Sequence, residues 1–128
     1  MQERPSVLIV DDDPTHLRIY GWIVEAAGYR AHLAEVRLAG VDLPDAPADL
    51  VLLDYRLGGS RTGALQVAKL IKSRLPDVPI IVLSEEFCLP DDIAPVVQGF
   101  VRKGDPAKLV DRLKQLLHPP LATMLAQP

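Results

Sequence analysis

The chain has almost no cysteine, and this excludes several kinds of chemistry. Cys88 is the single cysteine among 128 residues, so an internal disulfide, a CxxC redox pair and a cysteine-based zinc cluster cannot form. A lone cysteine in such a sequence usually packs as a small hydrophobe and is less often a reactive thiol. We therefore expect Cys88 to be buried.

Long apolar runs and an excess of positive charge are missing too. No apolar run approaches the roughly 20 residues that span a bilayer, and the N-terminal MQERPS lacks the apolar core of a signal peptide. The 14 Lys and Arg residues stand against 17 Asp and Glu, a formal net charge of −3, which argues against direct binding of nucleic acid through its phosphates. We expect a soluble, cytoplasmic protein that binds neither nucleic acid nor membrane.

The composition is that of one small globular domain, with 48% apolar and 24% charged residues. Strand and helix patterns alternate along residues 1–117, which we expect to form this domain. Residues 118–128, HPPLATMLAQP, are rich in proline and lack such a pattern. We expect them to form a C-terminal tail.

The alternating patterns predict an α/β fold. Unbroken apolar runs are typical of parallel strands buried on both faces, and five of them indicate a doubly wound, five-stranded parallel sheet in the order 2-1-3-4-5. Asp13 and Pro14 suit a helix cap and a first helical residue, and Gly28 is placed to end that helix. The expected strands are 6–10, 29–34, 50–53, 80–83 and 100–102, and the expected long helices are 14–27, 64–74 and 106–117.

Proline and glycine shorten the second and fourth helices of this pattern. Gly40, Pro44 and Pro47 interrupt the stretch 35–49, so we expect a helix there to be short and irregular. Pro95 in CLPDDIAPVVQ cannot lie inside a helix without losing a backbone hydrogen bond, at a cost of about 3 kcal/mol. We therefore predict at most one or two helical turns in that segment.

Four of the expected strands end on polar side chains. Asp11 and Asp12 follow the first strand, Asp54 the third, Ser84 the fourth and Lys103 the fifth. The carboxyl ends of parallel strands meet at one edge of a sheet, beside the crevice where the strand order reverses. Phosphoryl transfer needs positioning and charge neutralisation. The set predicts a site at which Asp54 is the nucleophile while Ser84 and Lys103 bind phosphoryl oxygens.

The acidic residues of this set also predict a metal ion. Carboxylates held close together repel one another, which raises some of their pKa values unless a cation is bound. Mg²⁺ prefers octahedral oxygen ligands and keeps several waters. We expect Asp12, Asp54 and the backbone carbonyl of Arg56 to bind Mg²⁺, together with a water held by Asp11. The histidines form no ligand pair in the sequence, and we assign no chemistry to them: His16, His32 and His118.

Four separated motifs agree in order and spacing with one known family. The segments VLIVDDDPTHLRIYGWIVEAAGY, DLVLLDYRL, PIIVLSE and GFVRKGD resemble the receiver domain of two-component response regulators, the CheY-like superfamily with a flavodoxin-like sheet, over residues 6–117. The resemblance implies that a histidine kinase or phosphotransfer protein donates a phosphoryl group from phosphohistidine to Asp54. It implies that Ser84 and Phe100 switch the surface that controls an unknown downstream protein. Such a domain is not an enzyme with a separate substrate, because it only phosphorylates and dephosphorylates itself.

The chain departs from the family pattern around the expected site. Gly104 follows Lys103 where receivers usually have proline, which favours a trans bond and a different direction for Lys103. Glu85 and Glu86 stand where small residues are usual, and we expect them, with Arg56, to tune the access of donors and water. The loop YRLGGSRTG resembles that of receivers attached to hybrid sensor kinases. Helix four commonly forms the dimer surface of the family, and because it is short here we expect a monomer.

Two other functions remain open. The motif DxDxT at Asp11, Asp13 and Thr15 matches the nucleophile motif of haloacid-dehalogenase-like phosphatases, which are enzymes acting on small phosphate esters. A helix beginning at Pro14 leaves no room for the flap of such enzymes. The other alternative is a receiver-like protein interaction module with weak or no phosphorylation, indicated by Gly104, Glu85 and the short fourth helix.

Overall fold

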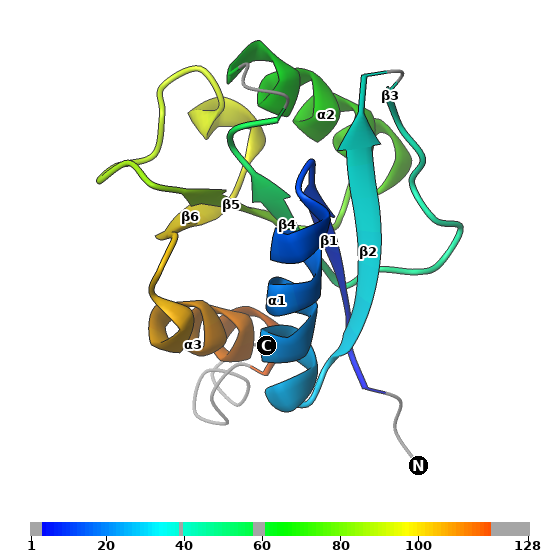
Figure 1. The fold of residues 1–128 in the computed structure, drawn as a ribbon, viewed down its shortest axis with the longest axis vertical. Helices are drawn as coiled ribbons and strands as arrows, with labels where there is room; N and C mark the ends of the chain where they lie inside the picture. The colour runs from blue at the N-terminus through cyan, green and yellow to red at the C-terminus, as the bar shows by residue number, and fades with distance from the viewer. Residues whose placement is uncertain (1–3, 39, 58–60, 119–128) are drawn as a thin grey trace, which may run out of the picture.

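A twisted sheet of six strands forms the centre of the structure, a computed structural model that describes residues 4–38, 40–57 and 61–118 (Figure 1). The strand order is β3-β2-β1-β4-β5-β6. Five of the strands are parallel, and the predicted α/β fold and 2-1-3-4-5 order of the parallel strands are confirmed. The strands are β1 (Ser6–Asp11), β2 (Arg30–Arg37), β3 (Gly40–Val41), β4 (Leu50–Asp54), β5 (Ile80–Ser84) and β6 (Gly99–Arg102).

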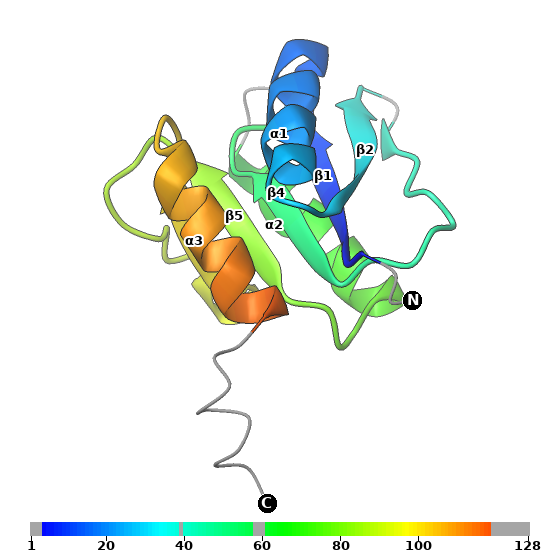
Figure 2. The same cartoon turned by 90° about the horizontal axis from the view of Figure 1, so that it is seen from below.

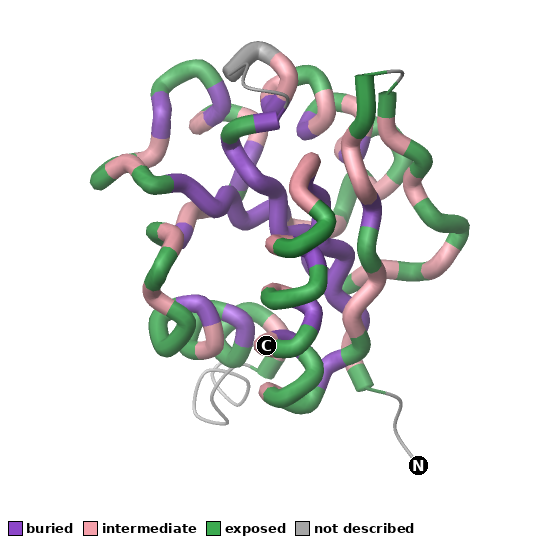
Figure 3. The backbone as a smooth tube through the Cα atoms, in the orientation of Figure 1, coloured by how far each residue is buried: buried purple, intermediate pink, exposed green. Residues whose placement is uncertain are grey.

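Helices cover both faces of the sheet. The helices α1 (Pro14–Ala26) and α3 (Pro106–Leu117) pack on one face, and α2 (Arg61–Arg74) packs on the other (Figure 2). The side chains of the central strands alternate between these two layers: in β1, Ile9 contacts the α1 and α3 side and Val10 contacts the α2 side. The central strands are therefore buried along their whole length, as the unbroken apolar runs predict (Figure 3).

Local signals in the sequence set the ends of α1 and α3. The side chain of Asp13 caps α1 by accepting a hydrogen bond of 2.8 Å from the Thr15 N–H. Gly28, just beyond the end of α1, has φ +102°, a conformation that glycine adopts without strain. The Asp105 side chain accepts from the Lys108 N–H and caps α3. Both predicted helix starts, Pro14 and Pro106, are confirmed.

The predicted short second helix is wrong. Among the described residues between β2 and β4 there is no helix: β2 extends to Arg37, and β3 pairs antiparallel with it, Val36 opposite Val41. Gly40 has φ +126°, which suits a reversal of the chain and not a helix. Prolines in the following loop disfavour a helix further on. The half-buried Val36, Val41 and Leu43 pack against the α2-side core.

The fourth helix is reduced to one turn, as predicted. It is the 3₁₀ helix η1 (Ala94–Val96), with Pro95 in its first turn, where the missing N–H costs no hydrogen bond. Ile93 is fully buried beside it, and Val97 is buried after it. The Tyr55 hydroxyl donates a hydrogen bond of 2.8 Å to Asp92 Oδ1. This bond joins the segment before η1 to the residue that follows β4.

Two further expectations concern residues near the surface. The prediction that Cys88 is buried is wrong, because its side chain is exposed in the loop after β5. His118, expected to begin the tail, stacks on Tyr29 with ring centroids 5.4 Å apart, while the rest of the expected tail, 119–128, lies outside the described residues. None of the described helices is long and apolar enough to cross a membrane.

The bond between Tyr55 and Asp92 leads to a prediction about stability. We expect Tyr55→Phe to lower the free energy of unfolding by about 1 kcal/mol, because the variant loses one partly buried hydrogen bond and keeps the ring. The amides near η1 should also exchange hydrogen faster with solvent. Urea unfolding and hydrogen exchange measure the two effects. Tyr29→Phe, at a buried ring with no such bond among the described residues, is the control, and equal behaviour of both variants would contradict the role of Asp92.

Candidate functional site

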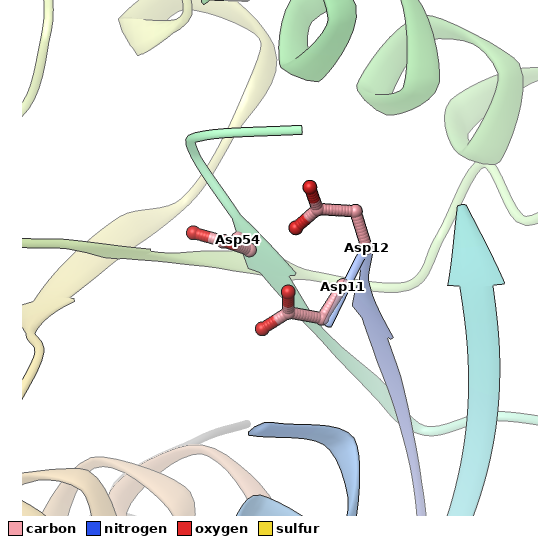
Figure 4. A group of neighbouring side chains, drawn as sticks. All are labelled: Asp11, Asp12 and Asp54. Carbon is pink, nitrogen blue, oxygen red and sulfur yellow. The ribbon is translucent and has the colours of Figure 1, made fainter. Parts of the chain in front are cut away.

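Three carboxylates meet at the carboxyl edge of the sheet. Asp11 ends β1, Asp12 follows it, and Asp54 ends the neighbouring parallel strand β4 (Figure 4). One oxygen from each side chain lies within 4.8 Å of the others. Asp11 and Asp54 are buried, and Asp12 is partly exposed. The register of β1 and β4 therefore brings together the three acids that the sequence predicts as metal ligands.

Lys103 reaches this cluster from the loop after β6. Its Nζ lies 2.7 Å from Oδ1 of Asp54, and the two side chains are 15% and 4% exposed. Burial alone lowers the pKa of Lys103, but the hydrogen bond and the charge of Asp54 outweigh it, so that the pKa of Lys103 is raised. Lys103 is thus held as an ammonium ion against the predicted nucleophile.

The bond after Lys103 is trans, as no cis peptide bond occurs among the described residues. The expectation that Gly104 directs Lys103 differently is wrong, since Lys103 contacts Asp54. Gly104 has φ +86°, which proline, fixed near −65°, cannot adopt. Glycine therefore provides another backbone route by which the lysine reaches the site.

Asp11 carries the largest electrostatic perturbation of the site. The pKa of Asp11 is raised to about 8, mainly by burial; the nearby Asp54 adds to this rise, and the hydrogen bond from the Asp13 N–H opposes it. Its Oδ2 is buried and has no hydrogen-bond partner. Three clustered carboxylates, one of them buried with a raised pKa, suit a hard divalent cation, which would supply the missing positive charge. The residues present therefore fit a magnesium ion.

Ser84 lies beside this cluster at the end of β5, the strand next to β4. It is buried, and its Oγ accepts a hydrogen bond of 3.1 Å from the Glu86 N–H. A hydroxyl that accepts one bond can still donate another. The main-chain oxygen of Ser84 accepts from the Lys103 N–H at 2.8 Å, so both predicted phosphoryl-binding residues are anchored to each other.

The remaining predicted residues lie around this centre. Phe100 is half-buried in β6 and packs against the core on the α2 side, and its role as a switch stays a prediction. Arg56 is exposed, and its N–H donates to Asp54 Oδ1 at 3.2 Å; the metal-binding role of its carbonyl stays a prediction. Glu85 is exposed and Glu86 is partly exposed at the rim. Their tuning role, with that of Arg56, likewise stays a prediction.

Two residues near the site were missed in the sequence. His16, to which we assigned no chemistry, lies on the first turn of α1 with Nδ1 3.7 Å from Asp11 Oδ2. Tyr20, one turn further on, lines a cavity of about 350 Å³ between α1 and α3 together with His16 and Lys103. His16 could have been predicted from the helix start at Pro14, because a helix that begins there places its first turn, and therefore His16, beside the acids.

A family model matches most of the chain. The model described as "Response regulator receiver domain" matches residues 7–114. The nitrogen assimilation regulatory protein NtrX of Azorhizobium caulinodans is 30% identical over 95 residues, which cover 73% of this chain and 21% of that protein. The photosynthetic apparatus regulatory protein RegA of Rhodovulum sulfidophilum is 35% identical over 98 residues, covering 76% and 52%. The chain thus matches about a fifth to a half of the length of these relatives.

Solved structures share the fold. The response regulator protein TrrA of Thermotoga maritima, solved in complex with Mg²⁺ and BeF, has a TM-score of 0.71 at 24% identity, covering 88% of this chain and 98% of that one. A CheY-like receiver domain protein of Methanospirillum hungatei also has a TM-score of 0.71, at 20% identity, covering 88% and 93%. These likenesses show the CheY-like fold.

The raised pKa of Asp11 predicts pH-dependent binding of Mg²⁺. Below about pH 8 a proton competes with the cation for this carboxyl, so the affinity should rise with pH, by up to about tenfold per unit for the release of one proton. The folding stability of the metal-free protein should instead fall as pH rises. Unfolded Asp11 ionises near the ordinary 3.8, so this carboxyl costs the fold increasing stability as pH rises toward 8.

Calorimetric titration with Mg²⁺ at pH 6, 7 and 8 tests this prediction. Asp11→Asn is the control, because an amide has no proton to release in this range, and its weaker binding should vary little with pH. Equal affinities of the unmodified protein at pH 6 and pH 8 would rule out competition at Asp11.

Proposed function

The chain belongs to the response regulator receiver domain family, and we propose that it takes a phosphoryl group from a phosphohistidine donor onto Asp54 with Mg²⁺ as cofactor. The observation that carries the proposal is the buried ion pair of Lys103 and Asp54, 2.7 Å long, within reach of two further carboxylates. The proposed nucleophile, the proposed cation ligands and the ammonium group proposed to bind phosphate thus lie close together. Little rearrangement is needed before transfer.

The chemistry follows from the placement of these groups. An oxygen of Asp54 attacks phosphorus in line with the leaving imidazole nitrogen of the donor, so one P–O bond forms as one P–N bond breaks. When bound, Mg²⁺ neutralises charge on the phosphoryl oxygens. In the unphosphorylated protein Lys103 is hydrogen-bonded to Asp54. Phosphoryl transfer removes the carboxylate charge of Asp54, so the Lys103 ammonium group can donate its hydrogen bond to a phosphoryl oxygen instead. Water later hydrolyses the aspartyl phosphate.

The switch is the second part of the proposal. The Ser84 hydroxyl retains a donor, and a phosphoryl group on Asp54 offers it an acceptor. Bonding to that acceptor would draw the loop after β5 toward the site, and Phe100 would turn into the space released. Surface changes in this loop and in η1 would then control a downstream protein. The donor would be a histidine kinase or a phosphotransfer protein.

A receiver-like interaction module with weak or no phosphorylation is the second candidate. The exposed Glu85 and half-exposed Glu86 at the rim favour it, since negative charge repels phosphoryl donors. The phosphatase alternative is not proposed, because the receiver family model matches the chain and α1 begins at Pro14, directly after the acids.

Labelling of Asp54 separates the two receiver hypotheses. With acetyl phosphate and Mg²⁺, we expect the unmodified protein to incorporate phosphate and Asp54→Asn to incorporate none, because the amide is not a nucleophile for phosphorus. Phosphoprotein electrophoresis or intact mass measures incorporation, and amide NMR spectra check the fold. Asp111→Asn, an equal loss of charge at an exposed position of α3, should label normally. Labelling of Asp54→Asn would show that another acid is the acceptor, and no labelling of the unmodified protein would favour the interaction module.

The short η1 predicts that activation does not produce the helix-four dimer common in the family. The segment offers one 3₁₀ turn, and Asp91 and Asp92 before it are exposed; like charges brought together across a symmetric interface repel. With Mg²⁺ and beryllofluoride, which mimics the phosphoryl group, we expect a monomer at micromolar concentration. Light scattering or sedimentation measures this. A beryllofluoride-dependent dimer that is lost when residues 91–97 are mutated would refute the expectation.

A further inference from the structure

His16 lies between two acids at the start of α1. Its Nδ1 is 3.7 Å from Oδ2 of Asp11, and its Nε2 is 3.7 Å from Oδ2 of Asp13. The two acids differ in their surroundings: Asp11 is 1% exposed, whereas Asp13 is 44% exposed. Water can donate hydrogen bonds to the exposed carboxylate of Asp13. The buried carboxylate of Asp11 needs a hydrogen-bond donor from the protein itself.

Two buried atoms face each other across that contact. Among the residues that the structure describes, Asp11 Oδ2 and His16 Nδ1 are the buried side-chain atoms without a hydrogen-bond partner. An imidazole N–H is a donor and a carboxylate oxygen is an acceptor, so one bond between them satisfies both. At 3.7 Å they are just too far apart for that bond. His16 also lines the cavity between α1 and α3, so its ring is not packed on every side and can turn.

The second oxygen of Asp11 is already anchored. Oδ1 accepts the Asp13 N–H at 3.0 Å, so a donor on Oδ2 would fix the plane of the carboxylate. Groups that hydrogen-bond to metal-binding side chains set the orientation of those side chains and with it the affinity for the ion. Asp11 also belongs to the acid cluster, in which one oxygen from each of Asp11, Asp12 and Asp54 lies within 4.8 Å of the others.

We propose that His16 is a positioning residue of the metal site, whose Nδ1–H donates to Asp11 Oδ2 when a divalent cation is bound. It does not bind the ion itself, but acts through Asp11. This inference rests on the proposed magnesium site, and it adds a residue that the acidic motif of the sequence does not contain.

Three substitutions of His16 separate its two nitrogens. The amide nitrogen of His16→Asn lies near the position of Nδ1, that of His16→Gln lies nearer to Nε2, and His16→Leu has no donor. In titrations with Mg²⁺ followed by amide NMR at one fixed pH, we expect His16→Leu to lose about tenfold or more in affinity. His16→Asn should restore most of this affinity, and His16→Gln should not. His32→Gln, on β2, is the control and should bind Mg²⁺ as the unmodified protein does.

A double-mutant cycle with Asp11→Asn distinguishes positioning from a general effect on the helix. If His16 acts through the carboxylate, His16→Leu should cause no further loss of Mg²⁺ affinity once Asp11 is an amide. A merely structural role at the start of α1 predicts the same loss in both backgrounds and would overturn the inference. Unchanged Mg²⁺ binding by His16→Leu would overturn it while leaving the metal site in place. Failure of the unmodified protein to bind Mg²⁺ would overturn both proposals.

Discussion

The burial of carboxylates at one edge of the sheet is the constraint on which the rest of the site depends. Asp11 and Asp54 end adjacent parallel strands, so the strand register forces their charges together in a region of low solvent access. A buried carboxylate without compensation is costly. Lys103 forms an ion pair with Asp54, and burial raises the pKa of Asp11 to about 8, which favours its neutral form. A bound divalent cation would neutralise part of the negative charge of these carboxylates, and a phosphoryl group on Asp54 would change that charge.

The two sides of the sheet differ in the secondary structure that they carry. On the α1 and α3 side, capped helices cover the sheet, and Leu17, Leu109 and Leu113 pack into one continuous core. On the α2 side, a short hairpin and a single 3₁₀ turn take the place of two helices. The side-chain hydrogen bond from Tyr55 to Asp92 helps to position the segment before the 3₁₀ turn. Since Tyr55 follows Asp54 directly, the less regular face is joined to the reactive edge.

The loop after β5 is held to β6 by one arginine. The Arg102 guanidinium lies 3.9 Å from the centre of the exposed Phe87 ring, and its Nε donates a long hydrogen bond, 3.4 Å, to the Glu85 main-chain oxygen. Contacts of this kind at an exposed position contribute only about 0.5–1 kcal/mol. These contacts add to the hydrogen bond between Tyr55 and Asp92 in positioning the segment between Ser84 and η1.

The sequence by itself determined the parallel strands, the ends of α1 and α3, and the acids, hydroxyl and lysine of the site. These follow from signals within a few residues: unbroken apolar runs, an aspartate before a proline, and polar residues where apolar runs end. Because the carboxyl ends of parallel strands share one edge, strand ends far apart in the chain could be assigned to one place. The predicted reduction of the fourth helix to at most one or two turns came from Pro95, which cannot lie inside a helix.

Only the tertiary structure decided the features that depend on neighbours distant in sequence. The hairpin of β2 and β3 forms because Val36 and Val41 find a core to pack against, and no local pattern distinguishes that from a weak helix. Cys88 is exposed in the loop after β5, a position that its local sequence does not reveal. The raised pKa of Asp11 and the position of His16 beside it arise from burial and packing, since desolvation is a property of the surrounding atoms and not of the residue.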